Sequence, residues 1–213
     1  MNHLENTRFI FNKYARAYKE KYLDQGNYGA MLLDFLEGIP NGGRILDLGC
    51  GPGNISRFLL DHRNDLELTG VDIAPAMLQE ARQLNPEAGF YEGNVLEIES
   101  FLQGGFDGVV SGFVLPYLDA GQVRLHLSQI ANLLSSGGVC YLSFLVGQKE
   151  SSGPVASVNT EGDVLYMHFY KEAAVESLIA KAGLQIISID KKTPRSQNGE
   201  PTNMEIMMIL RSS

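Results

Sequence analysis

Residues 47–53 combine one acid with three glycines at alternate positions: Asp47, Gly49, Gly51 and Gly53. They follow the apolar run 44–48, and a helical apolar pattern begins at Ile55. Glycines adopt backbone angles closed to other residues and carry no Cβ that would obstruct a ligand lying on the loop. A strand, a tight turn and a helix start are the local geometry with which Rossmann-like sheets bind a nucleotide. Asp47 is unusual there, because a carboxylate repels a phosphate and attracts a cation or a hydroxyl group.

A second acid, Asp72, ends the next apolar run about 20 residues after the glycine turn, where Rossmann-like sites place a carboxylate on the ribose hydroxyls. Its two oxygens can accept both hydroxyls of one ribose. The alternative is a structural acid that the helix dipole favours just before Pro75. The glycine turn upstream favours the ribose interpretation.

The spacing differs from the dinucleotide fingerprint G-x-G-x-x-G, which requires glycine at the position of Asn54. The pattern present is D-x-G-x-G-x-G, and it resembles motif I of the class I S-adenosylmethionine (SAM) methyltransferases. The resemblance extends over nearly the whole chain, with a core at 44–146 and a closing pair of strands. Residues 11–18 also resemble the F-x-x-x-A-x-x-Y signature of members that act on small molecules.

This resemblance implies a cofactor site around the glycine turn. Asp47 would accept from the ammonium of the methionine part, and Asp72 would bind the ribose. Asn94 stands where the family commonly has an acid near the adenine amino group; an amide can serve there, although a turn-forming role after Gly93 is the alternative. The full set of predicted cofactor contacts is Asp47, Gly49, Cys50, Gly51, Gly53, Asp72, Ile73, Met77, Asn94, Val95, Ser111 and Phe113.

The segment 111–117 follows a predicted strand and should face the transferred group, since ligands lie beyond the carboxyl ends of parallel strands. Small-molecule members often have a histidine where this chain has Pro116, so the most obvious candidate base is absent. Tyr14 and Tyr18 share one face of a predicted helix, and either line the acceptor site or pack on the domain, as does Tyr117.

His168 is the remaining candidate for a catalytic base and for a substrate contact. It lies between the fifth predicted strand and the next helix, where the family carries a substrate-facing insertion. A lone histidine is more often structural, and a base is needed only for a hydroxyl or a protonated amine.

Alternating strands and helices predict the scaffold. The strands are expected at 44–48, 66–71, 89–92, 106–112, 139–146, 184–190 and 204–210, and the helices at 4–22, 27–37, 54–62, 75–84, 120–135 and 171–182. Repeated βα units require a parallel sheet covered on both sides. We therefore predict an α/β fold, a three-layer Rossmann-like sandwich with a seven-stranded, mostly parallel sheet, an antiparallel strand seven and an N-terminal helical cap. One domain would comprise the cap (1–40), the SAM-binding core (44–146), an insertion or lid (147–170) and a helix with the closing hairpin (171–213).

Composition limits the function further. The 213 residues are 44% apolar and carry a net charge of −8, which argues against a nucleic-acid surface. The chain shows no apolar run of membrane-spanning length and no signal-peptide pattern at its start, and two cysteines form no disulfide framework or metal spacing. A cytoplasmic protein that acts on a small molecule, with no metal and no membrane or nucleic-acid partner, is the expectation.

The sequence thus predicts an enzyme that transfers a methyl group from SAM to a small molecule by in-line displacement, yielding S-adenosylhomocysteine. Two alternatives stay open. A non-catalytic SAM-binding homologue is favoured by Pro116, and an NAD-linked oxidoreductase would share the sheet and Asp72.

Overall fold

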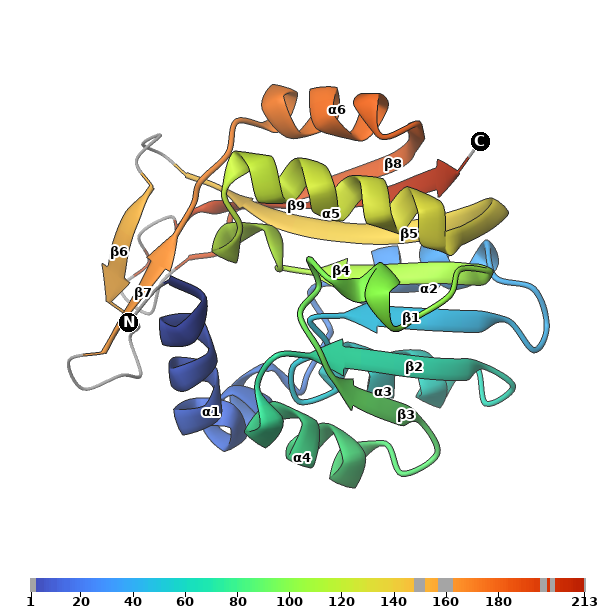
Figure 1. Ribbon diagram of the computed structural model, residues 1–213, viewed down its shortest axis with the longest axis horizontal. Coiled ribbons are helices and arrows are strands. Elements are labelled where there is room, and N and C mark those ends of the chain that lie inside the picture. Colours follow the sequence, from blue (N-terminus) through green and yellow to red (C-terminus); the bar gives the residue numbers. More distant parts are fainter. Residues whose placement is uncertain (1–2, 148–151, 157–162, 196–198, 200–201, 213) are drawn as a thin grey trace.

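A computed structural model describes residues 3–147, 152–156, 163–195, 199 and 202–212. Its centre is a seven-stranded sheet of order β3-β2-β1-β4-β5-β9-β8 (Figure 1). The strands are β1 (Arg44–Leu48), β2 (Glu67–Asp72), β3 (Gly89–Glu92), β4 (Phe106–Gly112), β5 (Leu134–Val146), β8 (Leu184–Lys192) and β9 (Met204–Ser212).

Strands β1 to β5 pair in parallel, whereas β9 lies between β5 and β8 and is antiparallel to both. The central strands are buried almost throughout, as a sheet covered on both faces requires. The predicted fold class, including an antiparallel strand seven inserted into a mostly parallel sheet, is confirmed.

Helices cover both faces of this sheet. The helices are α1 (His3–Tyr22), α2 (Gly29–Glu37), α3 (Asn54–His62), α4 (Pro75–Leu84), α5 (Ala120–Leu133) and α6 (Glu172–Lys181). Buried side chains of α5 and α6 pack on one face, and those of α2, α3 and α4 pack on the other. Two short 3₁₀ turns, η1 (Ile98–Ser100) and η2 (Leu115–Tyr117), follow β3 and β4.

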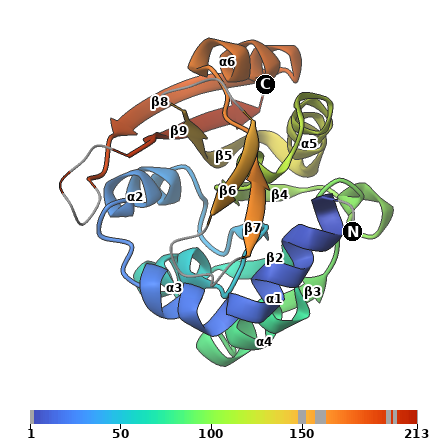
Figure 2. The same ribbon diagram turned by 90° about the vertical axis from the view of Figure 1, so that its left-hand side faces the viewer.

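The carboxyl edge of β1 to β4 faces α1 and a small hairpin of β6 (Gly153–Ala156) and β7 (Val164–Met167) (Figures 1 and 2). The amide of Asn6 on α1 donates to the carbonyl of Val164, and Lys13 pairs with Asp163 at 2.6 Å. Helix α1 also packs on α4. Helix α1 and the hairpin therefore lie over the edge at which parallel sheets bind their ligands.

Two local predictions need correction. Strand β5 begins at Leu134 rather than Val139, because Leu134 pairs with Phe106 before a register shift, and Gly137 takes a left-handed φ of 77°. The sequence predicts no strand in the polar stretch after β5, yet Gly153–Ala156 pairs with Val164–Met167. Residues 148–151 and 157–162 of the predicted insertion lie outside the described residues. No described helix combines the length and the apolar character needed to cross a membrane.

Candidate functional site

A cavity of about 430 Å³ lies between α1 and the carboxyl ends of the central strands. This volume falls within the usual range for small-molecule sites. The cavity brings together most of the residues predicted from the sequence: Tyr14, Tyr18, Asp47, Gly49, Cys50, Gly51, Asp72, Ile73, Met77, Asn94, Val95, Phe113 and Tyr117.

The glycine turn between β1 and α3 forms one wall of this cavity. Gly49, Gly51 and Gly53 all have a positive φ, of 67°, 53° and 79°. A Cβ on Gly49 would lie 2.6 Å from Val114, and one on Gly53 would lie 2.5 Å from Asn85, so these two positions serve close packing. A Cβ on Gly51 would meet nothing within 4 Å. Gly51 therefore leaves open space beside the turn, and Gly53 supports the turn from behind without lining the cavity.

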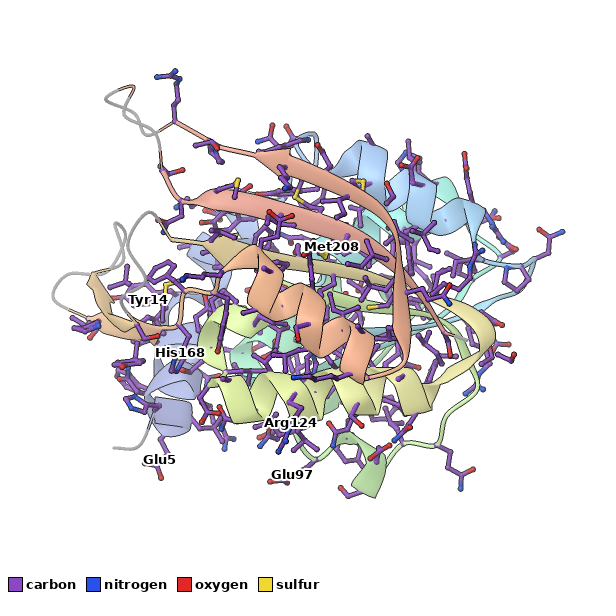
Figure 3. All side chains as sticks on the ribbon, turned by 90° about the horizontal axis from the view of Figure 1, so that it is seen from above. Glu5, Tyr14, Glu97, Arg124, His168 and Met208 are labelled. Carbon is purple, nitrogen blue, oxygen red and sulfur yellow. The ribbon has the colours of Figure 1, made fainter. Side chains whose placement is uncertain are left out.

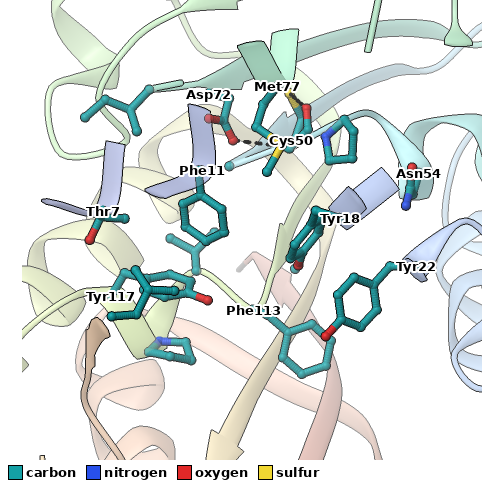
Figure 4. A pocket seen from close by; sticks show the side chains of 18 of the residues that line it. Thr7, Phe11, Tyr18, Tyr22, Cys50, Asn54, Asp72, Met77, Phe113 and Tyr117 are labelled. Atoms are coloured by element: carbon teal, nitrogen blue, oxygen red, sulfur yellow. Dashed lines mark hydrogen bonds between the residues drawn. The ribbon is translucent and has the colours of Figure 1, made fainter. Parts of the chain in front are cut away.

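Asp72 is tied to the turn by backbone hydrogen bonds. One carboxylate oxygen accepts from the N–H of Gly51 at 2.9 Å, and the other accepts from that of Ala74 at 2.8 Å. Burial raises the pKa of Asp72 to about 6, against the lowering effect of these donors. These hydrogen bonds hold the carboxylate beside the glycine turn, where it faces the cavity (Figure 4).

Asp47 lies deeper, with 1% of its surface exposed. Its carboxylate accepts from the hydroxyl of Ser56 at 2.6 Å. Burial, followed in the same direction by the charge of Asp72, raises the pKa of Asp47 to about 7 although the Ser56 bond lowers it. Neither acid forms an ion pair with a described residue. Two buried acids facing one cavity without a cation match a cationic ligand.

The position of Asn94 is compatible with both of the roles considered for it. It lines the cavity, and its side-chain oxygen accepts from the N–H of Leu96 at 3.0 Å in a turn of its own backbone. Met77 likewise lines the cavity while it packs, 1% exposed, with Ala15 and Ala74.

An aromatic lobe extends through the cavity from Phe11 and Tyr18, which pack beside Met77, to Phe113 and Tyr117, which lie farther from Asp72 (Figure 4). Its rings touch edge to face or tilted: Phe11 with Tyr18 and with Tyr117, Tyr18 with Tyr22, and Tyr28 with Phe113. Centroid separations of 4.5–5.8 Å are those of favourable aromatic pairs. We define the aromatic lobe as Phe11, Tyr18, Tyr22, Tyr28, Phe113 and Tyr117.

Phe113 is held there by its backbone. It is the one described non-glycine residue with a positive φ, 55°, and its N–H donates to the carbonyl and to the hydroxyl of Ser143, both at 3.0 Å. A non-glycine residue in this conformation is strained and frequently marks a functional site. The strain turns the Phe113 ring into the cavity directly after β4.

Ser111 and His168, unlike most of the predicted site residues, do not line the cavity. Ser111 is fully buried under α5, and its hydroxyl is 2.9 Å from Nε2 of His126, whose pKa burial lowers to about 4. Side chains alternate along a strand, so Leu165 and Met167 of β7 face the cavity and the residue after Met167 does not. The Nδ1 atom of His168 is 3.1 Å from the hydroxyl of Ser152 on the outer side, at the same end of the molecule as Tyr14 (Figure 3).

The hydroxyl of Tyr14 is also engaged. It donates to Asp163 at 2.7 Å, next to the ion pair between Lys13 and the same carboxylate. Tyr14 therefore lines the cavity with its ring while its hydroxyl joins α1 to the start of β7.

Sequence reasoning missed Tyr28 and Glu205. Both line the cavity, and the Tyr28 hydroxyl donates to the Glu205 carboxylate at 3.0 Å. Burial raises the pKa of Glu205. The signal was available, since Glu205 is the only acid in the otherwise apolar run 204–210 of the closing strand.

Among the described residues, no group of three His, Cys, Asp or Glu side chains is placed to hold a metal.

Comparison with known proteins connects this site to one class of enzymes. Residues 45–138 match the model of a methyltransferase domain. The chain is 28% identical over 185 residues to the biotin biosynthesis bifunctional protein BioHC of Cellvibrio japonicus, covering 87% of this chain and 36% of that protein. It is 47% identical over 55 residues to a trans-aconitate 2-methyltransferase of an Enterobacter species, covering 26% and 22%. The chain therefore spans well under half the length of these relatives.

A solved structure shares the whole fold. The magnesium protoporphyrin IX methyltransferase of Synechocystis, determined with bound S-adenosylhomocysteine, superposes with a TM-score of 0.76 at 18% identity, and 100% of both chains is covered. Identity at this level shows the fold alone. Together with the domain match, it agrees with the resemblance seen in the sequence: residues 45–138 match a methyltransferase domain, and the chain has the Rossmann-like fold of this SAM-dependent enzyme.

Proposed function

We propose that the cavity binds SAM at its glycine-turn end and that the protein transfers the methyl group to a small-molecule acceptor in the aromatic lobe. The observation that carries this proposal is the pair of buried acids, Asp47 and Asp72, facing one cavity beside the open turn at Gly51. SAM carries an ammonium and a sulfonium, so it supplies the positive charge that these acids lack.

Each wall of the cavity has a part in this binding mode. Asp72 accepts the ribose hydroxyls, and Asp47 accepts from the methionine ammonium. Ile73, Met77 and Val95 enclose the adenine, and the amide NH₂ of Asn94 donates to a ring nitrogen, because its carbonyl oxygen already serves the turn to Leu96. Cys50 fills space under the turn beside Gly70.

When bound, SAM supplies an electrophilic methyl group on its sulfonium. The protein's contribution is to hold a nucleophile in line with that methyl and to exclude water. Phe113 and the tyrosines of the aromatic lobe present ring faces and edges to this part of the cavity, where they favour a cation and leave little room for solvent. Helix α1 and the β6–β7 hairpin cover the site at the same edge (Figure 2).

Calorimetric titration with SAM, S-adenosylhomocysteine and NAD tests the cofactor. We expect the first two to bind and NAD not to bind; the reverse would favour an NAD-linked oxidoreductase. Transfer of a labelled methyl group from SAM into a metabolite extract then tests the activity and identifies the acceptor.

A non-catalytic SAM-binding protein is the second candidate. Two observations favour it: Pro116 replaces the histidine common in small-molecule members, and His168 lies outside the cavity. SAM binding without labelled product in any extract would select it.

A further inference from the structure

We propose that the methyl acceptor is an amine, and that Glu205, held by Tyr28 at the end of the aromatic lobe, binds its protonated form. This inference rests on the proposed function, because it assigns the acceptor half of the same cavity. It names a chemical class of acceptor and one residue that selects it.

The position of Glu205 places a negative charge in the acceptor half. Glu205 lies near the start of β9, opposite Leu145 of β5 and Lys192 of β8. Its carboxylate accepts from the hydroxyl of Tyr28, whose ring packs edge to face on Phe113 with centroids 5.5 Å apart. Phe113 follows β4 and lies in the aromatic lobe away from Asp72 (Figure 4). Through Tyr28, the Glu205 carboxylate is therefore on the Phe113 side of the cavity, which is the acceptor end in the proposed binding mode.

The charge of Glu205 has no cation bound to it within the described part of the chain. Lys192 is its cross-strand neighbour, and the Lys192 charge lowers the pKa of Glu205 against the raising effect of burial, but the two described side chains form no ion pair. The Lys192 ammonium lies 3.4 Å from Asp190 and donates to the carbonyl of Asn27. The other titratable groups near Glu205 are the neutral phenols of Tyr28 and Tyr141. A half-buried carboxylate with a single neutral donor retains strong attraction for a cation.

The charges around the whole cavity favour the same conclusion. Among the described residues that line it, the acids are Asp47, Asp72 and Glu205, and the only base is Lys21, which lies over the ring of Tyr22. Asp47 and Asp72 serve the cofactor in the proposed binding mode, so Glu205 remains for the acceptor. An anionic acceptor would face Glu205 with Lys21 as the one described lining base to receive it, whereas an ammonium finds a carboxylate.

The aromatic lobe suits an amine with an apolar or aromatic body. Rings within about 6 Å of a cation attract it through their faces, and they also pack against a flat or apolar skeleton. The lobe carries phenol hydroxyls, and burial raises the pKa of Tyr28 and of Tyr117, so both stay neutral at physiological pH. The lobe therefore adds attraction for a cation without adding negative charge.

Glu205 also completes the proton balance of the transfer. A protonated amine must give up one proton before its nitrogen lone pair can attack, and the carboxylate accepts that proton. The nitrogen then forms the bond to the methyl carbon while the carbon–sulfur bond breaks with its electron pair left on sulfur. The products are the methylated ammonium, S-adenosylhomocysteine and neutral Glu205, which returns its proton to water.

Matched probes on one carbon skeleton test the assignment. The wild-type protein, saturated with S-adenosylhomocysteine, is titrated with 2-phenylethylamine, 2-phenylethanol and 3-phenylpropanoate, and with the benzyl and phenylpropyl series. We expect the amines to bind at least about tenfold more tightly than the carboxylates, and Glu205→Gln to remove most of that preference. Tyr28→Phe should reduce it by a factor of about three, since it removes the hydroxyl that orients Glu205.

The controls separate this inference from the proposed function. Glu37→Gln makes the same chemical change on the exposed end of α2 and should keep the amine preference. All variants should bind S-adenosylhomocysteine within about twofold of wild type, which also reports that they fold. Failure of the wild type to bind SAM would refute the proposed function. Normal cofactor binding with no amine bound, with carboxylates bound equally well, or with the preference intact in Glu205→Gln would overturn this inference alone.

Discussion

The affinity for SAM should rise steeply between about pH 5.5 and pH 7.5, the range in which its α-ammonium stays mostly protonated. Burial raises the pKa of Asp47 to about 7 and that of Asp72 to about 6 in the protein without ligand. A cationic ligand binds the ionised carboxylates, so protons compete with it. The sign is therefore fixed: acid weakens binding and base strengthens it until the ligand itself loses its proton.

The size of this effect can be worked out from the two pKa values. At a pKa of about 7 for Asp47, the ionised fraction grows from roughly 3% at pH 5.5 to roughly 75% at pH 7.5, a factor of about 25. At a pKa of about 6, Asp72 contributes a further factor of about 4. The product, about 100-fold or roughly 3 kcal/mol, is the upper limit if only the doubly ionised site binds. We expect a change between about 10- and 100-fold.

Calorimetry across this pH range measures the affinity, and repeating it near pH 6.5 in two buffers of different ionisation enthalpy measures the protons released on binding. We expect release of up to about one proton there. In Asp47→Asn, the change in SAM affinity between about pH 5.5 and pH 7.5 should shrink to the factor of about 4 that Asp72 contributes. Asp34→Asn, a matched change on the exposed face of α2, should behave as wild type. An affinity that varies less than about twofold in the wild type, with no proton release, would refute the reasoning.

Three further predictions follow from individual contacts. Asp72→Ala should weaken SAM binding by at least about tenfold in calorimetry, because it removes the ribose acceptor, and an unchanged affinity would remove the assignment. Gly53→Ala should lower the free energy of unfolding by about 2 kcal/mol or more in urea titration, since the new Cβ would lie 2.5 Å from Asn85. Gly137→Ala is the control, because Gly137 has a similar φ but open surroundings, and it should lower the free energy of unfolding by about 1 kcal/mol. Equal losses in the two variants would contradict this packing argument. His168→Ala should leave turnover within about twofold, and a large loss of kcat without loss of stability would return this histidine to the mechanism.

The cofactor half of the cavity could be predicted from the sequence because its residues are local. Residues 47–53 and Asp72 lie at the ends of neighbouring parallel strands, and the topology alone brings those ends together. Ser111 lies away from the cavity for a local reason, since the strand alternation that places Gly112 at the cavity turns the Ser111 hydroxyl toward His126. The position of Ser111 near the end of a strand could be predicted from the sequence. The sheet face toward which its side chain points could not, because that depends on how α5 packs on β4.

The acceptor half could not be predicted in the same way, because distant segments build it. Tyr18 comes from α1, Tyr28 precedes α2, Phe113 follows β4 and Glu205 belongs to β9. They meet only because β9 inserts between β5 and β8, which places the start of this last strand beside the segment that leads into α2. No local pattern encodes that meeting.

One residue of that half nevertheless left a trace in the sequence. A carboxylate inside an apolar strand is costly to bury, so it persists only where something offsets the cost, either a partner in the protein or a ligand. For Glu205 the partner is a single tyrosine hydroxyl, which does not neutralise a charge. The lone acid in the apolar closing strand thus marks Glu205 in the sequence as a candidate for a ligand contact, although the segments that meet it are apparent only from the fold.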